Sequence, residues 1–208
     1  MPSVSRGWCA VIERIEQLVF LALNTHLLMK FWPGMFQPDH IISTLYVFNQ
    51  TIVVVFLLIR RSAQNISWRP GDHLVATVST LLPLLVQPPT GNSLLPLPVL
   101  FLMLLLGIML HLGAKLTLRR SFGILPANRG IKSDGLYRFV RHPMYLGYIF
   151  SELSLILAGP TAWNATIFIA NCLLFGVRIS AEERVLGQSS EYREFCRTTP
   201  YRLVPGLY

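Results

Sequence analysis

Long apolar runs constrain the fold of this chain more than any other feature. Residues 41–59 are uncharged, and residues 96–118 carry one charge, at Lys115. An α-helix needs about 20 mostly apolar residues to cross a bilayer, where every backbone N–H and C=O must be paired internally. Of the 208 residues, 52% are hydrophobic and 13% are charged, about half the charge of a soluble domain. We therefore predict an all-α, polytopic membrane protein.

The apolar residues fall into six segments, which predicts about five or six transmembrane helices. The segments cover residues 18–31, 41–59, 73–86, 96–118, 144–157 and 163–177. We also consider an amphipathic extension of the first back to Trp8. The third contains Pro83, which a helix bundle tolerates where neighbours pair the freed carbonyl. The last two form a hairpin around Gly159-Pro160, and its first arm is short for a full crossing. We divide the chain into four N-terminal spans, residues 1–118, and a C-terminal region, residues 119–208.

The remaining C-terminal residues are more polar. We expect the helix that starts near residue 163 to run on to about Gly187, a further helical turn or two over residues 191–196, and an extended tail from Thr199. The chain has three cysteines, at positions too far apart for a metal motif or a disulfide framework.

The net charge of +8 raises the question of nucleic-acid binding, but the basic residues flank the apolar runs. In that position they more often face anionic lipid and set topology. Arg60, Arg61 and Arg69 follow the second run, and six basic residues lie between positions 119 and 141. The positive-inside rule then predicts a multi-pass protein of the inner (cytoplasmic) membrane, with both termini in the cytoplasm.

A basic, aromatic segment, residues 135–147, precedes the hairpin. Pro143 suits the first turn of a helix and holds His142 outside it. The free N–H groups at that helix start, together with Arg141, favour binding of a carboxylate or phosphate. Gly147 leaves a notch one turn into the helix, where a ligand is able to approach the backbone. Taken alone, the segment is equally compatible with an interfacial cap flanked by basic anchors.

A second polar mark, Arg-Ile-Ser-Ala-Glu-Glu-Arg at residues 178–184, closes the other arm of the hairpin. Glu182 and Glu183 taken alone fit a solvated helix face. The order Arg-His-Pro-x-Tyr-x-Gly, apolar hairpin, Glu-Glu resembles the isoprenylcysteine carboxyl methyltransferase and phospholipid methyltransferase superfamily of integral membrane enzymes. The resemblance covers roughly residue 121 to the C-terminus, and the compact form is similar to prokaryotic members.

The resemblance implies methylation of a lipophilic acceptor by S-adenosylmethionine. Acceptors in the superfamily are carboxylates, amines or thiols that enter from the bilayer, so the implied partners are a lipophilic molecule and membrane lipids, with no nucleic acid. Region 119–208 would hold the catalytic machinery at the cytoplasmic face. Methyl transfer requires alignment of the nucleophile with the methyl group rather than a metal ion, and we predict no metal site.

The residue types of the two polar segments, residues 135–147 and 178–184, suit different parts of S-adenosylmethionine. Arg141, His142 and the helix start at Pro143 suit its carboxylate. Glu182 and Glu183 suit the ribose hydroxyls or the ammonium group. The predicted catalytic residues are Arg141, Glu152 and Glu183.

Aromatic residues and the tail complete the predicted cofactor-binding set. Tyr137 and Tyr145 offer ring faces to a cation or to adenine. The family resemblance, rather than any spacing, suggests that the tail around Tyr201 and Leu203 pairs its backbone with the adenine edge. The glycine of the first motif, Gly147, is also placed in this set.

Glu152 lies inside the first hairpin arm, on the helical face of Tyr145 and Tyr148. An acid within an apolar run is a functional candidate by default, and a hydrogen bond to a neighbouring helix is an equally good explanation. His26 and His111 are expected to act as hydrogen-bonding residues of the bundle rather than as catalysts.

Two other classes of function compete with methyl transfer. Sterol C14-reductases have a similar C-terminal half but use NADPH, whose additional phosphate needs positive charge that Arg129, Lys132 and Arg138 are able to supply. A non-catalytic membrane scaffold or transporter is the third possibility, and the paired motifs argue against it.

Overall fold

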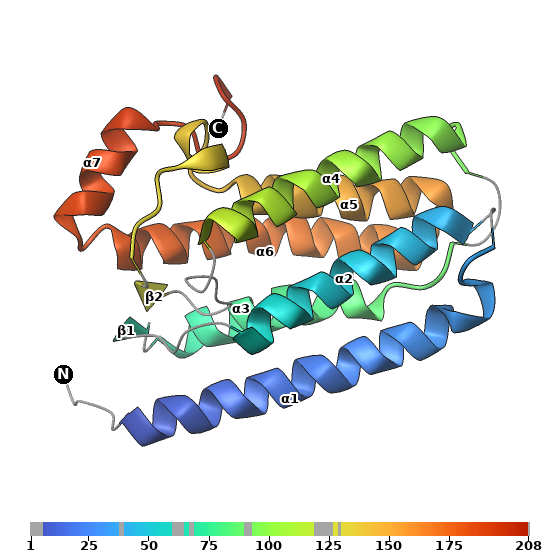
Figure 1. Ribbon diagram of the computed structural model, residues 1–208, viewed down its shortest axis with the longest axis horizontal. Helices are drawn as coiled ribbons and strands as arrows, with labels where there is room; N and C mark the ends of the chain where they lie inside the picture. Colours follow the sequence, from blue (N-terminus) through green and yellow to red (C-terminus); the bar gives the residue numbers. More distant parts are fainter. Residues whose placement is uncertain are drawn as a thin grey trace.

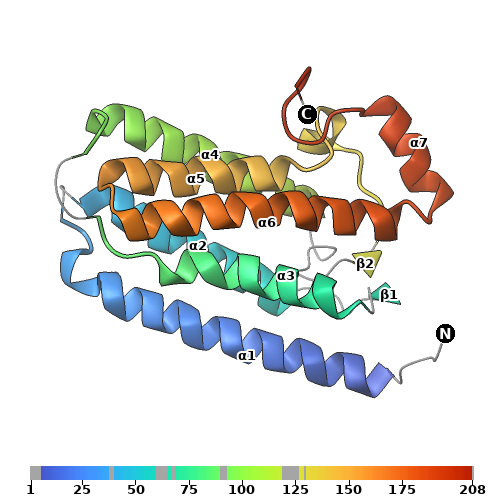
Figure 2. The ribbon, with the colours of Figure 1, turned by 180° about the vertical axis from the view of Figure 1, so that it is seen from behind.

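The structure is a computed structural model that describes residues 6–37, 40–59, 65–66, 69–89, 93–118, 127–128 and 130–207. Long helices run side by side along one axis, and α7 crosses them steeply at one end (Figures 1 and 2). The elements are α1 (Arg6–Phe31), η1 (Trp32–Gly34), α2 (Ile41–Ile59), β1 (Asn65–Ile66), α3 (Pro70–Leu81), η3 (Leu82–Leu85), α4 (Leu97–Leu118), β2 (Ala127–Asn128), η5 (Gly135–Arg138), α5 (Pro143–Ala158), α6 (Ala162–Leu186) and α7 (Ser190–Thr198).

The predicted all-α membrane fold is confirmed, and the apolar runs locate the helices well. The hairpin predicted around Gly159-Pro160 is formed by α5 and α6, and α6 ends at Leu186. The third segment starts earlier than predicted, at Pro70, and its α-helix stops at Leu81, where the 3₁₀ helix η3 continues. Pro83 explains the break, because proline lacks an N–H and its ring clashes with the preceding turn of an α-helix. The strands β1 and β2 form one antiparallel pair of two residues each.

Three of the described helices, α2, α4 and α6, are long and apolar enough to cross a membrane by length and composition. They support the assignment as an integral membrane protein. At about 1.5 Å per residue, the 16 residues of α5 span roughly 24 Å, less than the hydrocarbon core of about 30 Å. The prediction of five or six crossings therefore stays a prediction.

The helices stack in layers, with α4, α5 and α6 on one side, α2 and α3 in the middle, and α1 on the outside (Figures 1 and 2). A buried apolar cluster joins α1, α2, η3, α4 and α5, and it includes Leu27, Tyr46, Leu57, Leu104 and Leu155. Burial of apolar area against several helices at once is what fixes their mutual positions.

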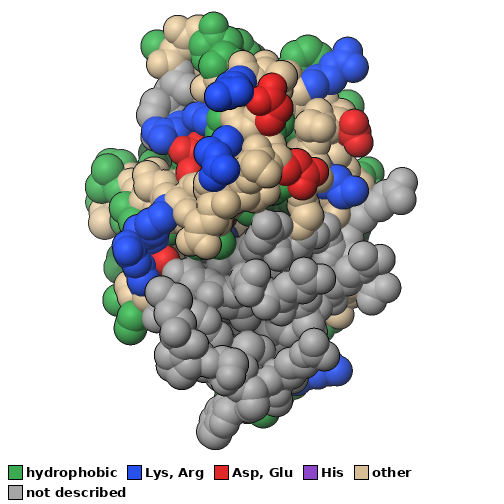
Figure 3. Space-filling view, turned by 90° about the vertical axis from the view of Figure 1, so that its left-hand side faces the viewer, with side chains coloured by type: hydrophobic (Ala, Val, Ile, Leu, Met, Phe, Trp, Pro, Cys, Tyr) green, Lys and Arg blue, Asp and Glu red, His purple; other side chains and the backbone are tan. Residues whose placement is uncertain are grey.

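The N-terminal end of α1, the β1–β2 pair, α7 and the C-terminal tail all lie at one end of the bundle (Figure 1). Basic and acidic side chains of the described residues are mixed at that end (Figure 3). The shared end agrees with the predicted topology, but the side of the membrane on which it lies stays a prediction. Arg60, Arg61, Arg119, Arg120 and Arg129, on which that prediction partly rests, lie outside the described residues.

Candidate functional site

The C-terminal tail folds back against the Arg-His-Pro segment. The Arg141 N–H donates to the carbonyl of Tyr201 at 2.9 Å, and the His142 N–H donates to the carbonyl of Arg202 at 2.8 Å. His142 is not helical, with φ −132° and ψ 55°, as expected for a residue before proline, so α5 begins at Pro143 as predicted. The two backbone bonds bring a segment 60 residues further along the chain to the start of α5.

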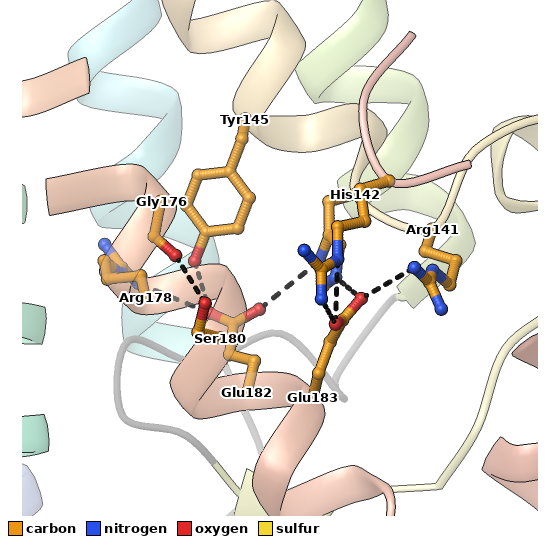
Figure 4. Close-up of polar contacts among 9 residues, drawn as sticks. Arg141, His142, Tyr145, Gly176, Arg178, Ser180, Glu182 and Glu183 are labelled. Atoms are coloured by element: carbon orange, nitrogen blue, oxygen red, sulfur yellow. Dashed lines mark hydrogen bonds and ion pairs between the residues drawn. The ribbon is translucent and has the colours of Figure 1, made fainter. Parts of the chain in front are cut away.

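Glu183 is the centre of a group of basic side chains (Figure 4). Its Oε1 lies 3.2 Å from Nη2 of Arg141 and 3.3 Å from Nε2 of His142. Its Oε2 accepts from Nε of Arg202 at 2.9 Å and from Nη2 at 2.6 Å. Arg141 and His142 were predicted to bind a ligand carboxylate, and here both contact a carboxylate of the protein itself.

Glu182, the residue before Glu183 on α6, makes a second set of contacts. Its Oε1 accepts a hydrogen bond from the Tyr145 hydroxyl, and its Oε2 lies 3.7 Å from Nδ1 of His142. Nη2 of Arg178 is 3.9 Å from Glu182 Oε1, and its guanidinium lies 5.4 Å from the centre of the Tyr145 ring. The structure therefore brings Arg141, His142, Tyr145, Glu182 and Glu183 together, and we call these five the polar cluster.

Arg178 links the polar cluster to α3. It is 5% exposed, and its Nη1 donates to the hydroxyls of Ser79 at 3.0 Å and Thr80 at 3.1 Å. Sequence reasoning gave Arg178 no role. Its position four residues before Glu182 was the feature that indicated a contact, because residues four apart share a helical face.

A pocket lies beside the polar cluster, between α2, α3, α5 and α6. Its wall is formed by Gln50, Val53, Ser79, Thr80, Pro83, Met144, Tyr148, Glu152, Phe175 and Arg178. Arg178 connects the two, since it lines the pocket and contacts Glu182 of the polar cluster. A group bound in the pocket would therefore lie next to a group bound at the polar cluster.

Glu152 lies in this pocket rather than in the polar cluster. It is 5% exposed, and Nδ2 of Asn171, on α6, donates to both of its carboxylate oxygens at 2.9 and 3.1 Å. Both explanations considered for Glu152 thus apply, because it bonds to a neighbouring helix and also faces a cavity. Asn171 was not singled out in the sequence, although it lies seven residues before Arg178, two helical turns away.

Tyr137 and the tail residues lie around the polar cluster. Tyr137 is buried in a cluster that includes Ala114, Met144 and Tyr192. Burial raises the pKa of its phenol, and the nearby charge of Glu182 adds to the effect, so the hydroxyl stays protonated. Leu203 packs against the group formed by Tyr145, Phe175 and Ile179, whereas Tyr201 is 40% exposed.

Gly147 differs from the prediction. The expected notch for a ligand is filled by α4, because a Cβ at Gly147 would lie 2.6 Å from the backbone N of His111 and 2.7 Å from the carbonyl oxygen of Gly107. Gly107 is equally close to α5 through Ser151. Small residues allow two membrane helices to approach closely. The physical role of Gly147 is therefore packing of α5 on α4.

A second buried polar group lies on α4. Nζ of Lys115 is 2.9 Å from Nδ1 of His111, and the other ring nitrogen of His111 contacts Oδ1 of Asn49. Lys115 also lies 4.5 Å from the centre of the Tyr148 ring. His111 thus bonds within the bundle, as expected, whereas the buried Lys115 was not anticipated. Among the described residues, no group of three His, Cys, Asp or Glu side chains is placed to hold a metal ion.

Comparison with known proteins matches this part of the chain to a family. A sequence profile described as the isoprenylcysteine carboxyl methyltransferase (ICMT) family matches residues 94–188. This part of the chain is thus similar to the ICMT family. The predicted superfamily is thereby confirmed, and the ICMT match extends further toward the N-terminus than the motifs indicated, so that it includes α4.

The fold agrees with the ICMT match. The chain is similar to a solved structure titled "Structure of the eukaryotic intramembrane Ras methyltransferase ICMT (isoprenylcysteine carboxyl methyltransferase) without a monobody", with 16% identity and a TM-score of 0.50. The alignment covers 96% of this chain and 83% of that chain. No curated protein sequence matches the chain. The tail that carries Arg202 lies beyond the ICMT match.

Proposed function

We propose that this protein is a membrane methyltransferase that transfers a methyl group from S-adenosylmethionine to an acceptor with an apolar tail. One observation carries the proposal: in the segment that matches the ICMT family, the polar cluster lies directly beside a pocket, and Arg178 contacts both. A cofactor with charges of both signs and a lipophilic acceptor need such adjacent sites.

The residues of the polar cluster fit the charges of S-adenosylmethionine. Arg141 is mostly buried, and its Nε donates no hydrogen bond to any residue that the structure describes, which leaves a donor for the methionyl carboxylate. Glu182 and Glu183 offer carboxylate oxygens to the ammonium group or to the ribose hydroxyls. S-adenosylmethionine supplies an activated methyl group that already carries its leaving group.

The contribution of the protein is alignment. The bond from Tyr145 fixes the Glu182 carboxylate, and Arg178 fixes it from the other side while holding α3. A reacting pair held in the right geometry gains about 7–11 kcal/mol relative to free reactants. The tail adds Arg202 to Glu183, and this charged pair must rearrange if the cofactor takes the same carboxylate. We therefore assign Glu183 and the tail to cofactor binding and Glu152 to the acceptor.

The site lies at the end of the bundle that holds α7 and the tail, and we place that end at the cytoplasmic face of the inner membrane. The support is the positive-inside rule together with the clustering of the predicted cytoplasmic segments at one end (Figure 1).

An NADPH-dependent reductase is the alternative that the sequence left open. Of the three basic residues assigned to the extra phosphate, Lys132 and Arg138 are exposed and Arg129 lies outside the described residues. Arg138 stacks on its neighbour Phe139 at 5.1 Å. Neither Lys132 nor Arg138 is part of the polar cluster, and the family match favours methyl transfer.

Isothermal titration of the purified protein with S-adenosylhomocysteine and with NADPH tests the proposal. We expect micromolar binding of S-adenosylhomocysteine and none of NADPH. Binding of NADPH alone would replace the proposal by the reductase, and binding of neither would support a scaffold or transporter.

A further inference from the structure

The polar side chains of the pocket wall differ in how many of their hydrogen bonds are already made within the protein. The strongest donor of the wall, Arg178, already donates to Ser79 and Thr80 and lies 3.9 Å from Glu182. The hydroxyls of Ser79 and Thr80 donate in turn to the carbonyl of Ala76. Nη1 of Arg178 and the hydroxyls of Ser79 and Thr80 are thus engaged within the protein.

The acceptors are less fully used. The two carboxylate oxygens of Glu152 share a single donor group, Nδ2 of Asn171, although a carboxylate has about four lone-pair positions. Asn171 is completely buried, and its Oδ1 accepts no hydrogen bond from any residue in the described part of the chain. Of these two residues Glu152 lines the pocket, and its remaining lone-pair positions suit a ligand that brings N–H groups.

The aromatic residues of the wall favour the same ligand. Tyr148 and Phe175 both line the pocket, and their rings stack at 6.0 Å. Ring faces attract cations through the quadrupole of the π-system. The hydroxyl of Tyr148 is both donor and acceptor and so does not discriminate between ligands. A carboxylate, in contrast, would meet the like charge of Glu152.

From these observations we propose that the methyl acceptor is a lipophilic primary or secondary amine, and that Glu152 is the catalytic residue that receives its ammonium group and takes its proton. The inference rests on the proposed function and names its acceptor class. An alkylamine arrives protonated near neutral pH, and an ammonium has no lone pair with which to attack.

Proton transfer to Glu152 precedes methyl transfer in the proposed reaction. The Glu152 carboxylate takes one proton from the ammonium and becomes a carboxylic acid. The lone pair of the free amine then forms a bond to the methyl carbon of S-adenosylmethionine while the bond from sulfur to that carbon breaks. The products are the methylated ammonium and S-adenosylhomocysteine, and Glu152 afterwards returns its proton to solvent.

Three acceptors with the same tail test the head group directly: dodecylamine, dodecanethiol and dodecanoate. They are given to the wild-type protein in lipid nanodiscs with tritium-labelled S-adenosylmethionine. We expect label in the amine and little in the thiol or the carboxylate. Preferential labelling of the thiol or the carboxylate, or no labelling of any acceptor by a protein that binds S-adenosylhomocysteine, would overturn the inference and leave the cofactor site standing.

Substitutions at Glu152 test its role as the base. General base catalysis contributes about 100-fold or more to a rate, so Glu152→Gln should lower kcat/KM for dodecylamine by that factor, and Glu152→Asp should retain more activity than Glu152→Gln. Ser154→Ala is the matched control, because Ser154 is buried on the same helix and donates to Leu100, away from the pocket. Equal amine turnover in Glu152→Gln and wild type would overturn the inference.

Two binding measurements separate the inference from the proposed function. Without the methyl donor, dodecylamine but not dodecanoate should raise the unfolding temperature of the wild type, and Glu152→Gln should lose this shift while binding S-adenosylhomocysteine normally. A shift that persists in Glu152→Gln would overturn the role of Glu152. Failure of the wild type to bind S-adenosylhomocysteine would overturn the proposed function and, with it, this inference.

Discussion

Gly147→Ala distinguishes helix packing from ligand binding at the first motif. The added Cβ would lie 2.6 Å from the backbone N of His111 and 2.7 Å from the carbonyl oxygen of Gly107. These are backbone atoms of α4, so the two helices must separate. Overpacking of this kind costs about 1–3 kcal/mol, and for a chain of this size each kcal/mol lowers the melting temperature by about 2–4 °C. We expect a fall of about 2–12 °C, measured by thermal unfolding in nanodiscs.

The matched control is Gly176→Ala on α6, where a Cβ would meet nothing within 4 Å. Alanine is a better helix former than glycine by roughly 1 kcal/mol, so this variant should unfold at the wild-type temperature or above it. The packing explanation fails if Gly147→Ala is as stable as the wild type. It fails most clearly if Gly147→Ala keeps its stability but loses affinity for S-adenosylhomocysteine, because that result would restore the predicted ligand notch.

Three further predictions concern the polar cluster and the topology. Glu182→Gln removes a charge-assisted hydrogen bond of ~1.5–3 kcal/mol and should weaken S-adenosylhomocysteine binding about tenfold or more by titration, whereas unchanged affinity would remove Glu182 from the site. Arg178→Ala leaves buried partners unpaired and should lower the free energy of unfolding by about 3 kcal/mol, and a loss below about 1 kcal/mol would contradict the link between α3 and α6. Single cysteines replacing Arg61, Asn128 and Ser189 in a cysteine-free chain should all react from the same side of oriented vesicles, and opposite labelling of position 128 would refute a cytoplasmic site.

The helices were predictable because their cause is local. Apolar runs specify which segments leave water, and Pro143 specifies where α5 begins, since its ring fixes φ and excludes His142 from the helix. The contact between the two motifs was also within reach, because their order along a short hairpin places Glu182 and Glu183 near the start of α5.

Other contacts were not predictable because each needs a partner that the sequence does not specify. Nothing in the tail indicates that Arg202 pairs with Glu183, since that contact depends on a backbone pairing with Arg141 and His142. Gly147 is compatible with either a ligand or another helix, and only the position of α4 decides between them. Lys115 was read as part of an apolar run, and its burial depends on His111 beside it.

The most direct test of the account is an experimental structure of the protein with S-adenosylhomocysteine bound. We expect the ligand carboxylate at Arg141, its ribose or ammonium group within hydrogen-bond distance of Glu182 or Glu183, and its sulfur facing the pocket lined by Tyr148 and Arg178. Binding at any other place in the bundle, or with the sulfur turned away from that pocket, would contradict the account.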